Sequence, residues 1–459
     1  MMQELTAVIL AAGKGTRMKS DMPKVLHKVG GKPMLQYVMD AVTYAGAQKQ
    51  VVVVGYLGEQ VRAYVGDEVS IVEQKEQLGT AHAVLQAKDV LKDFDGTTMI
   101  VCGDTPLVDG QELKTFYEQH LASQATASVF TAILDDATGY GRIVRDTAGN
   151  VLKIVEHKDA TPEQLVIREI NTGIYCLDNQ TLFAMIDKIE CNNSQGEFYL
   201  TDIIDLLVND NKTVGAIRAK NADSTVGINS RHQLVQVENM MRERKLDRLM
   251  DEGVTILSPA NTFIADDAEI GKDTVIYPFT WIESGCKIGK RCQIGPNVRL
   301  QNAEIGDSNV IHFTYAHEVV IGDNCNVGPF AHLRPGTQLG DDVKVGNFVE
   351  VKNSWVGEGS KLPHLSYIGD ADLGSRVNMG CGTITVNYDG KRKHRTRIED
   401  NAFVGCNTNL VAPVTVGENS YVAAGSTITK DVPPNALGVA RAKQNNIEGW
   451  AAKNKNILE

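Results

Sequence analysis

The chain has no paired cysteine motif and no long apolar run. Its eight cysteines are scattered without a Cys-x-x-Cys pair, which disfavours both a zinc site and a disulfide framework and fits a reducing compartment. The apolar run at 7–12 is too short for a signal or membrane segment, and Lys14 and Arg17 follow it closely. We therefore expect a cytoplasmic protein that is neither exported nor anchored in a membrane.

An excess of basic charge is also missing. The formal net charge is -11 at pH 7. Nucleic-acid binding needs a broad basic face, so this balance argues against such a partner and indicates that any bound phosphate is small and held locally. At 459 residues the chain is too long for a single core, and we expect two or three domains.

The C-terminal half follows neither common periodicity and instead carries an aliphatic residue at every sixth position. This suits neither a helix, with about 3.6 residues per turn, nor an alternating strand, so each unit should turn one corner of a triangular parallel β-helix. The aliphatic side chains should point inward, and glycine follows many of them where we expect tight bends. Three runs in phase argue against a β-sandwich with chance spacing. The runs are Ile264, Ile270, Ile276, Ile282, Ile288, Ile294, Leu300; Ile321, Val327, Leu333, Leu339, Val345, Val351; and Ile398, Val404, Leu410, Val416, Val422, Ile428.

Residues 1–229 show a different pattern, in which short β-rich runs alternate with helical ones. This alternation predicts an α/β doubly wound, Rossmann-like domain. Residues 230–253 begin with the capping-box spacing Ser230 to Gln233 and then keep helical spacing as far as Gly253, which predicts a connecting helix. In the first domain we predict strands over 7–10, 51–54 and 99–102 and helices over 34–45 and 80–91.

The third predicted domain, 254–459, holds the β-helix, which we expect to run to about residue 435. Its period breaks after Ile384, and the insertion 385–397 should form a protruding basic loop. The tail, 436–459, loses the repeat and is expected to fold back over the last coil or lie on a neighbouring subunit.

A glycine-rich loop follows the first predicted strand. Its backbone N–H groups can cradle phosphate oxygens at the sheet edge where α/β proteins bind ligands, although such turns often bind nothing. The loop fails the dinucleotide fingerprint, because Met18 takes the third glycine position, and no Gly-Lys-Ser/Thr completes a Walker pattern. With Pro23-Lys24 it resembles the signature of the sugar-nucleotide pyrophosphorylases, which grip a nucleoside triphosphate. The candidate residues are Leu10, Ala11, Ala12, Gly13, Lys14, Arg17 and Lys24.

Two further motifs supply a base reader and a metal ligand. The amide of Gln74, which is followed by Gly79 and Thr80, offers a donor and an acceptor that match a uracil edge. Asp104 follows Gly103 at the end of a predicted strand, and Mg²⁺ needs few protein ligands because phosphates and water complete its shell. The resemblance implies Asn229 as the second Mg²⁺ ligand, and Gly141, Glu156 and Asn171 as residues that hold the sugar and its acetamido group.

No histidine–carboxylate pair is evident near these motifs. A sugar 1-phosphate is already an anionic nucleophile, so its attack on the α-phosphorus of UTP needs alignment and charge neutralisation rather than a general base. This chemistry fits the residues of the first domain.

The repeat region carries a candidate base of its own, His364 in Lys361-Leu-Pro-His364-Leu-Ser-Tyr367. No cysteine or serine nucleophile is paired with it, so direct attack by a substrate amine fits better than an acyl-enzyme. Histidine ionises near pH 6.5 and can deprotonate such an amine. We hypothesise that Glu350 orients the ring. A surface histidine without a role is the alternative.

The two sets of motifs, in this order over nearly the whole chain, resemble the bacterial bifunctional family that joins N-acetylglucosamine-1-phosphate uridyltransferase to glucosamine-1-phosphate acetyltransferase. The resemblance implies a homotrimer, Mg²⁺, and UTP and acetyl-coenzyme A as co-substrates. It implies His364 as the acetyl-transfer base, and glucosamine 1-phosphate bound by Arg334, Lys352, Tyr367, Asn378 and Asn387. Acetyl-coenzyme A contacts are implied at Cys381, Asn387, Tyr388, Cys406, Ala424 and Arg441.

Cys381 and Cys406 depart from the family, which has alanine and serine there, so we expect main-chain groups to do most of the coenzyme binding at these positions. The basic insertion either reaches the coenzyme's phosphates on a neighbouring subunit or is only solvated. The interpretation is a bifunctional enzyme that acetylates glucosamine 1-phosphate and then couples N-acetylglucosamine 1-phosphate to UTP. One alternative is a monofunctional nucleotidyltransferase with a structural β-helix, and another is a scaffold protein with decayed sites.

Overall fold

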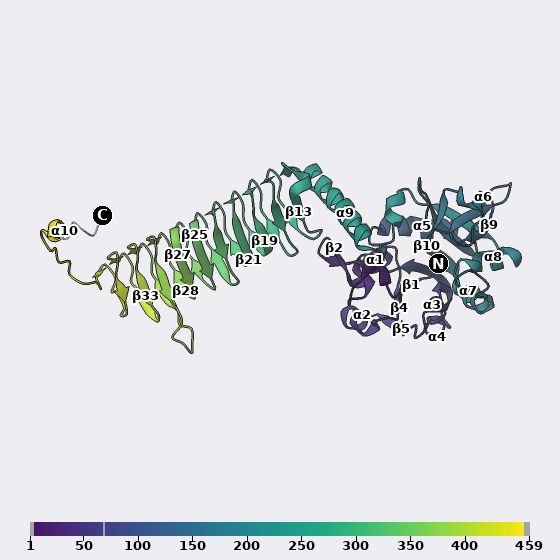
Figure 1. Cartoon of the computed structure of the whole chain (residues 1–459), viewed down its shortest axis with the longest axis horizontal. Helices are drawn as coiled ribbons and strands as arrows, with labels where there is room; N and C mark the ends of the chain where they lie inside the picture. The colour runs from purple at the N-terminus through teal and green to yellow at the C-terminus, as the bar shows by residue number, and fades with distance from the viewer. Residues whose placement is uncertain (1–3, 68, 454–459) are drawn as a thin grey trace. The chain divides into compact units, whose positions relative to one another are not determined.

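The computed structural model describes residues 4–67 and 69–453. The chain divides into two compact units, Met1–Met241 and Arg242–Glu459. Figure 1 shows a mixed α/β unit built from the N-terminal half and a stack of short strands built from the C-terminal half. Among the described residues, no helix combines the length and apolar character that a membrane crossing requires.

The first unit is built on a mixed sheet in the order β11-β7-β10-β6-β1-β4-β5. Strands β6, β1, β4 and β5 are parallel, whereas β10 runs antiparallel to both β6 and β7. The three predicted strands are confirmed within β1, β4 and β6. The bounds are β1 Glu4–Ala11, β2 Lys28–Val29, β3 Lys32–Pro33, β4 Lys49–Val54, β5 Ser70–Glu73, β6 Gly96–Cys102, β7 Ala127–Ile133, β8 Arg142–Arg145, β9 Val151–Val155, β10 Glu169–Asp178 and β11 Val214–Arg218.

Helices cover this sheet and bury two apolar cores, one on each face. The helix predicted over 34–45 is confirmed as α1, but the helix predicted over 80–91 is wrong, because it is divided into α3 and α4 at Gln86 and Ala87. The bounds are α1 Met34–Tyr44, α2 Gly58–Val65, α3 Thr80–Leu85, α4 Lys88–Leu91, α5 Gly110–Ser123, α6 Pro162–Leu165, α7 Asn179–Met185 and α8 Asp202–Asn209.

Helix α9, Arg231–Asp251, follows the first unit's last strand. Ser230 Oγ accepts the backbone N–H of Gln233 at 3.3 Å, as in a capping box, but the side chain of Gln233 reaches back to the backbone N–H of Asn229 rather than of Ser230, at 2.8 Å. Val237 belongs to an apolar cluster of the first unit, and Leu246 and Leu249 belong to the core of the second.

The second unit is a left-handed parallel β-helix in which each strand pairs with the equivalent strand of the next coil, usually the third strand along the chain. The aliphatic residues of the three predicted runs all lie in one continuous core, which confirms the inward positions. The bounds are β12 Thr255–Ile256, β13 Thr262–Ile264, β14 Glu269–Ile270, β15 Val275–Ile276, β16 Thr280–Ile282, β17 Lys287–Ile288, β18 Gln293–Ile294, β19 Arg299–Ile305, β20 Val310–Ile311, β21 Thr314–Ile321, β22 Asn326–Val327, β23 Ala331–Leu333, β24 Thr337–Leu339, β25 Lys344–Lys352, β26 Trp355–Val356, β27 Lys361–Gly369, β28 Ala371–Leu373, β29 Asn378–Met379, β30 Ile384–Val386, β31 Thr396–Ile398, β32 Phe403–Val404, β33 Asn409–Val411, β34 Val414–Val416, β35 Tyr421–Val422, β36 Thr427–Ile428 and β37 Leu437–Gly438.

The glycines that follow the inward residues serve mainly close coil stacking rather than unusual backbone angles. A Cβ on Gly271 would lie 2.7 Å from the carbonyl carbon of Gly289 in the next coil, and one on Gly322 would lie 2.9 Å from the carbonyl carbon of Gly340. Only a glycine lets the next coil approach so closely.

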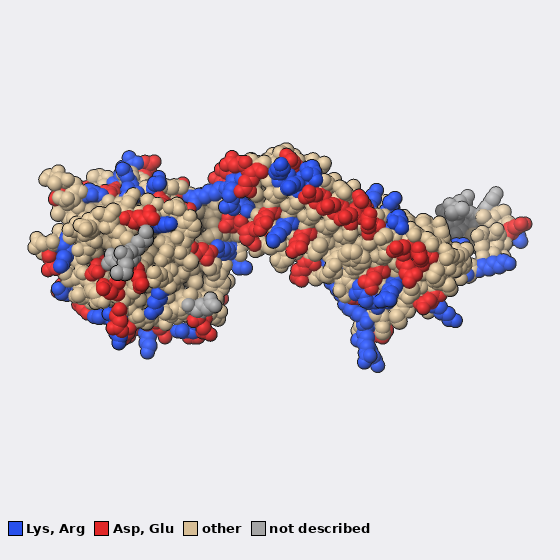
Figure 2. Space-filling model, turned by 180° about the vertical axis from the view of Figure 1, so that it is seen from behind, with Lys and Arg blue, Asp and Glu red and all other residues tan. Residues whose placement is uncertain are grey.

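Two boundaries in the β-helix differ from the prediction. The inward position next to the insertion is Thr385, which is buried, whereas Ile384 faces outward, so the loop is confined to 387–395. The six-residue period continues through Thr385, but the aliphatic pattern does not show it because threonine is polar. The coils also extend past residue 435, because β37 pairs with β35, and residues 442–453 are exposed rather than folded over the last coil. Figure 2 shows basic side chains gathered on the loop that projects from the β-helix.

Candidate active sites

The first group of predicted residues gathers where β1 and β6 end. The backbone N–H of Gly103 donates to the carbonyl of Leu10 at 2.9 Å, which joins the two strand ends. The loop after β1 leaves Gly13, Lys14 and Arg17 exposed, and a 3₁₀ helix, Thr16–Met18, closes it. Exposed backbone and two cationic side chains therefore lie at the carboxyl edge of the sheet, which is where a phosphate would be bound.

Lys24 brings two further residues of this edge together. Its ammonium forms an ion pair with Asp104, and it donates to Asn229 Oδ1 at 3.0 Å. The two acceptors come from segments 125 positions apart in sequence (229 minus 104), so the tertiary fold alone makes them meet. Gly227 lies beside both, because a Cβ there would be 3.8 Å from Asp104 Oδ2 and 3.9 Å from Asn229 Nδ2.

Gln74 lies under the neighbouring loop and is almost completely buried. Its amide nitrogen donates to the carbonyl of Gly79 at 3.0 Å and lies 3.1 Å from His82 Nδ1, so both N–H groups of the amide have partners. Thr80 Oγ1 accepts the backbone N–H of Leu200 at 2.9 Å. Gly79 itself packs against the chain at Phe198, so these contacts hold the loop in one position.

Gly141, Glu156 and Asn171 also converge, although they lie in separate segments. A Cβ on Gly141 would lie 3.5 Å from Glu156 Oε1 and 3.6 Å from the Cβ of Asn171. Burial raises the pKa of Glu156, and a hydrogen bond from Thr201 Oγ1 at 3.3 Å partly offsets that effect. The fold thus places a partly desolvated carboxyl beside a backbone position with no side chain.

The second group lies on neighbouring coils of the β-helix. Strands β25 and β27 are parallel, and their register puts Asn347 opposite His364 and Glu350 opposite Tyr367. His364 Nδ1 is 2.6 Å from Asn347 Oδ1, whereas Glu350 Oε1 accepts from Arg334 Nη1 at 2.7 Å. The hypothesis that Glu350 orients His364 is therefore wrong, because Glu350 is engaged by Arg334.

Several polar side chains surround Asp370, a buried residue that the motifs did not single out. Its carboxylate accepts from Asn353 Nδ2 and from Asn387 Nδ2, each at 2.5 Å, and Asn387 Nδ2 is also 3.4 Å from Tyr367 Oη. The fold therefore ties Asn387 and Tyr367 to one buried carboxylate. These residues are far apart in the sequence and meet only because successive coils stack, so an alignment of the coils, rather than a local motif, is needed to find this group.

Lys352 and Asn378 lie on strands next to this group. Lys352 is the last residue of β25, and the nearby ammonium group of Lys393, in the insertion, lowers its pKa because it disfavours a second positive charge. Asn378 begins β29, opposite Lys361 of β27. The insertion thus bends back toward the coil that carries His364.

Cys381, Cys406 and Ala424 occupy equivalent corners of three successive coils. The backbone N–H of Asn407 donates to the carbonyl of Cys381 at 2.7 Å, and that of Gly425 donates to the carbonyl of Cys406 at 2.8 Å. Arg441 Nη1 donates to the carbonyl of Ala424 at 3.1 Å. Tyr388, at the base of the insertion, is exposed. These residues form a line along one edge of the β-helix.

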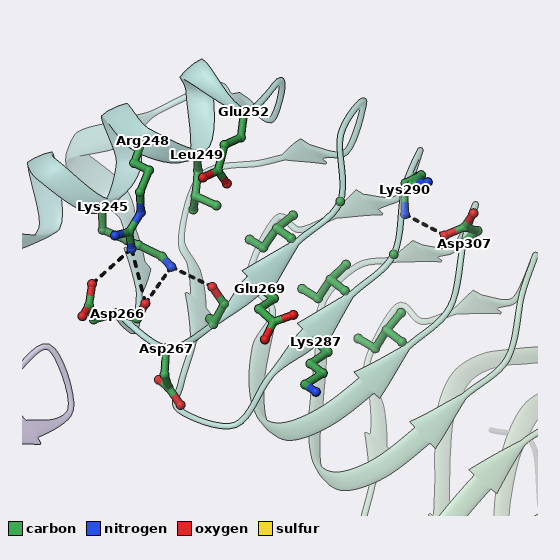
Figure 3. Close-up of a pocket in the computed structure, with 16 residues that line it drawn as sticks. Lys245, Arg248, Leu249, Glu252, Asp266, Asp267, Glu269, Lys287, Lys290 and Asp307 are labelled. Carbon is green, nitrogen blue, oxygen red and sulfur yellow. Dashed lines mark hydrogen bonds and ion pairs between the residues drawn. The ribbon is translucent and has the colours of Figure 1, made fainter.

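A hollow of about 680 Å³ in the second unit contains none of the predicted residues (Figure 3). Lys245 donates to the carbonyls of Asp266 and Ala268 at 2.8 and 2.7 Å, and desolvation by burial lowers its pKa. Asp307 accepts the backbone N–H of Lys290 at 2.8 Å. The contacts of Lys245 fasten the end of α9 to the first coils, and the contact of Asp307 joins two neighbouring coils. We assign these contacts a structural role.

A glycine-rich loop with exposed cations at the edge of a doubly wound sheet, followed by a β-helix of six-residue repeats with a polar group around a histidine, is the arrangement expected of a transferase with two separate sites. Known proteins agree with this class. Residues 6–235 match the nucleotidyl transferase family, residues 259–364 match the GMPPB C-terminal domain, and residues 395–430 match the bacterial transferase hexapeptide repeat.

Full-length relatives narrow the class further. The chain is 54% identical over 444 residues to the bifunctional protein GlmU of Geobacillus sp. (strain WCH70), with 97% of each chain covered. It is 49% identical over 450 residues to that of Halalkalibacterium halodurans, covering 98% of this chain and 99% of the relative. The chain belongs to the family of the bifunctional protein GlmU.

Proposed function

We propose that the chain acetylates glucosamine 1-phosphate with acetyl-coenzyme A at the β-helix, and then couples the resulting N-acetylglucosamine 1-phosphate to UTP at the α/β unit. The observation that carries this proposal is the near full-length match to relatives named as bifunctional proteins, across both halves of the chain. A nucleotidyltransferase with a purely structural β-helix is disfavoured by the same match. Both co-substrates are cytoplasmic metabolites, so we place the protein there.

At the α/β unit, the loop from Leu10 to Arg17 binds the triphosphate of UTP. Its main-chain N–H groups and the cations Lys14 and Arg17 face the phosphates, while Lys24 balances the charge of the reacting groups. Gln74 lies next to Gly79 and Thr80 and reads the uracil edge through its side-chain oxygen, because its amide nitrogen is already engaged within the loop. Gly103, directly after β6, completes the binding edge of the sheet. The phosphate oxygen of the sugar attacks the α-phosphorus and pyrophosphate leaves, with no general base required.

Mg²⁺ fits beside Asp104 and Asn229. Their oxygens already converge on one ammonium, that of Lys24, so they are suitably placed to meet at one divalent cation. Among the described residues no cluster of three or more histidine, cysteine or acidic side chains could hold a metal, as befits an ion that takes few protein ligands. When bound, Mg²⁺ neutralises and aligns the phosphates.

The sugar of the same reaction lies against Gly141, Glu156 and Asn171. Because Gly141 has no side chain, the acetamido group can approach the backbone there. Glu156 and Asn171 then accept and donate hydrogen bonds to the sugar hydroxyls and the acetamide.

At the β-helix, His364 acts as the base that removes a proton from the amine of glucosamine 1-phosphate. The amine nitrogen forms a bond to the thioester carbonyl carbon, the carbon–sulfur bond breaks, and the released thiolate takes up a proton. Arg334 and Lys352 bind the sugar phosphate, and Tyr367, Asn378 and Asn387 bind its hydroxyls. The line of Cys381, Asn387, Tyr388, Cys406, Ala424 and Arg441 holds acetyl-coenzyme A, mainly through main-chain groups.

We also propose that three copies assemble through the β-helix. Phe313, Phe330 and Phe348 form an exposed column in which neighbouring ring centroids are 5.4 and 5.3 Å apart. A contiguous aromatic surface of this kind is best covered by another copy of the chain. Assembly would complete the acetylation sites at the subunit boundaries.

Separate substitutions in the full-length protein test the two activities. Asp104→Ala should abolish pyrophosphate release yet leave acetyl transfer intact, because the acetylation residues all lie in the second unit. His364→Ala should lower acetyl transfer about 100- to 10,000-fold and leave uridylyl transfer intact. If His364→Ala is silent in an assay with acetyl-coenzyme A, the β-helix is only structural. Loss of both reactions from either change in folded protein would contradict two independent sites.

A further inference from the structure

The ring of His364 has one side-chain hydrogen-bond partner among the described residues, Asn347 Oδ1, 2.6 Å from Nδ1. The two residues face each other across parallel strands of adjacent coils, so the stacking of the coils fixes their separation. A carboxamide oxygen can only accept a hydrogen bond. The ring proton must therefore sit on Nδ1, which leaves the lone pair on Nε2.

We propose that Asn347 is the positioning residue of the acetyl-transfer reaction: it holds His364 in the tautomer whose Nε2 takes the proton from the attacking amine. This inference rests on the proposed role of His364 as the base. It assigns to a neutral amide the task that a carboxylate performs in many other base–histidine pairs.

The other candidates near the ring are already engaged. Glu350 pairs with Arg334 and lies opposite Tyr367 rather than His364. Ser366 Oγ donates to the backbone carbonyl of His364 at 2.9 Å, so it supports the strand and not the imidazole. Asn347 thus has the required geometry and no competing partner among these groups.

A neutral partner suits this chemistry. A carboxylate at 347 would stabilise the protonated imidazole and so keep more of the base in its inactive form near neutral pH. The amide fixes the direction of the ring without that electrostatic effect. Since Nδ1–H stays committed to Asn347 while Nε2 accepts and later returns a proton, the two ring nitrogens keep distinct roles through the reaction.

Two substitutions in the full-length protein separate orientation from charge. Asn347→Leu removes the acceptor at similar volume, and we expect kcat for acetyl transfer to fall about 10- to 100-fold while KM for glucosamine 1-phosphate changes less than about threefold. Asn347→Asp keeps the acceptor, so it should retain kcat within about fivefold at high pH, with the acid limb of the pH–rate profile moved up by about one pH unit.

Asn326→Leu is the matched control, since Asn326 is an exposed asparagine on β22 with no part in either site, and it should leave acetyl transfer unchanged. Glu350→Gln should not move the acid limb, because that side chain does not contact the ring. Uridylyl transfer should be normal in every variant, which also reports that the protein is folded.

Two results would overturn the inference: Asn347→Leu with wild-type kcat, or Asn347→Asp with both an unmoved acid limb and a lower plateau than Asn347→Leu. The second result would mean that the amide donates to the ring rather than accepting from it. If His364→Ala itself were silent, the proposed function would fail first, so the two failures are distinguishable.

Discussion

Gly79 offers a sharp test of how the uridylyl site is held in place. Its backbone, at φ 122° and ψ 176°, lies in a region that is essentially restricted to glycine. A Cβ added there would lie 2.4 Å from the carbonyl oxygen and 2.7 Å from the nitrogen of Phe198. Both contacts are with backbone atoms, which cannot move aside as a flexible side chain could.

These two effects set the size of the expected change in Gly79→Ala. The backbone strain costs about 1–3 kcal/mol, and the forced overlap costs about 1–3 kcal/mol more. For a unit of this size each kcal/mol lowers Tm by about 2–4 °C, so the thermal transition of the first unit should fall by about 4–24 °C. If the loop moves to relieve the overlap, Gln74 loses its anchor at the Gly79 carbonyl and KM for UTP rises instead.

Calorimetry and uridylyl kinetics on the full-length protein measure both outcomes. Gly149→Ala is the matched control, because Gly149 also has a positive φ, 90°, but nothing lies within 4 Å of an added Cβ. It should show the strain alone, without a change in KM. The reasoning is refuted if the two variants have the same Tm and the same UTP kinetics. Acetyl transfer should be normal in both.

Two further predictions concern charge and the coenzyme edge. Burial and the neighbouring Asp205 and Asp159 raise the pKa of Asp202 from 3.8 to about 6, so its ionised form destabilises the folded state above that pH. Asp202→Asn should therefore stabilise the first unit at pH 8 by about 1–2 kcal/mol, allowing for the half-exposed side chain. This gain in stability should shrink as the pH falls from 6 to 4. An equal gain at pH 8 and at pH 4 in melting scans would contradict this cause. Cys406→Ser should change KM for acetyl-coenzyme A less than about threefold if main-chain groups bind the coenzyme, whereas a tenfold decrease would show that the serine hydroxyl matters.

The residues at the ends of β1 and β6 could be identified from sequence, because a loop after a buried strand is a local pattern. How they meet could not. Asp104 and Asn229 share the ammonium of Lys24, and Gly141 lies beside Glu156, only because the sheet order brings distant segments together. The Glu350 hypothesis failed for the same reason. It selected a partner for His364 by charge, whereas the register of the parallel strands determines which residues of adjacent coils lie opposite one another. The partner, Asn347, lies 17 positions before His364 (364 minus 347), one coil away.

The sequence alone determined the β-helix, its inward positions and the change from an α/β pattern to a repeat pattern along the chain, because a six-residue period and strand-end loops are patterns among neighbouring residues. It placed the insertion boundary wrongly, since buried Thr385 continues the period with a polar side chain. Only the tertiary structure decided which side chains face one another across coils and strands. Those contacts depend on register and sheet order, which are set by packing of the whole unit rather than by any local pattern.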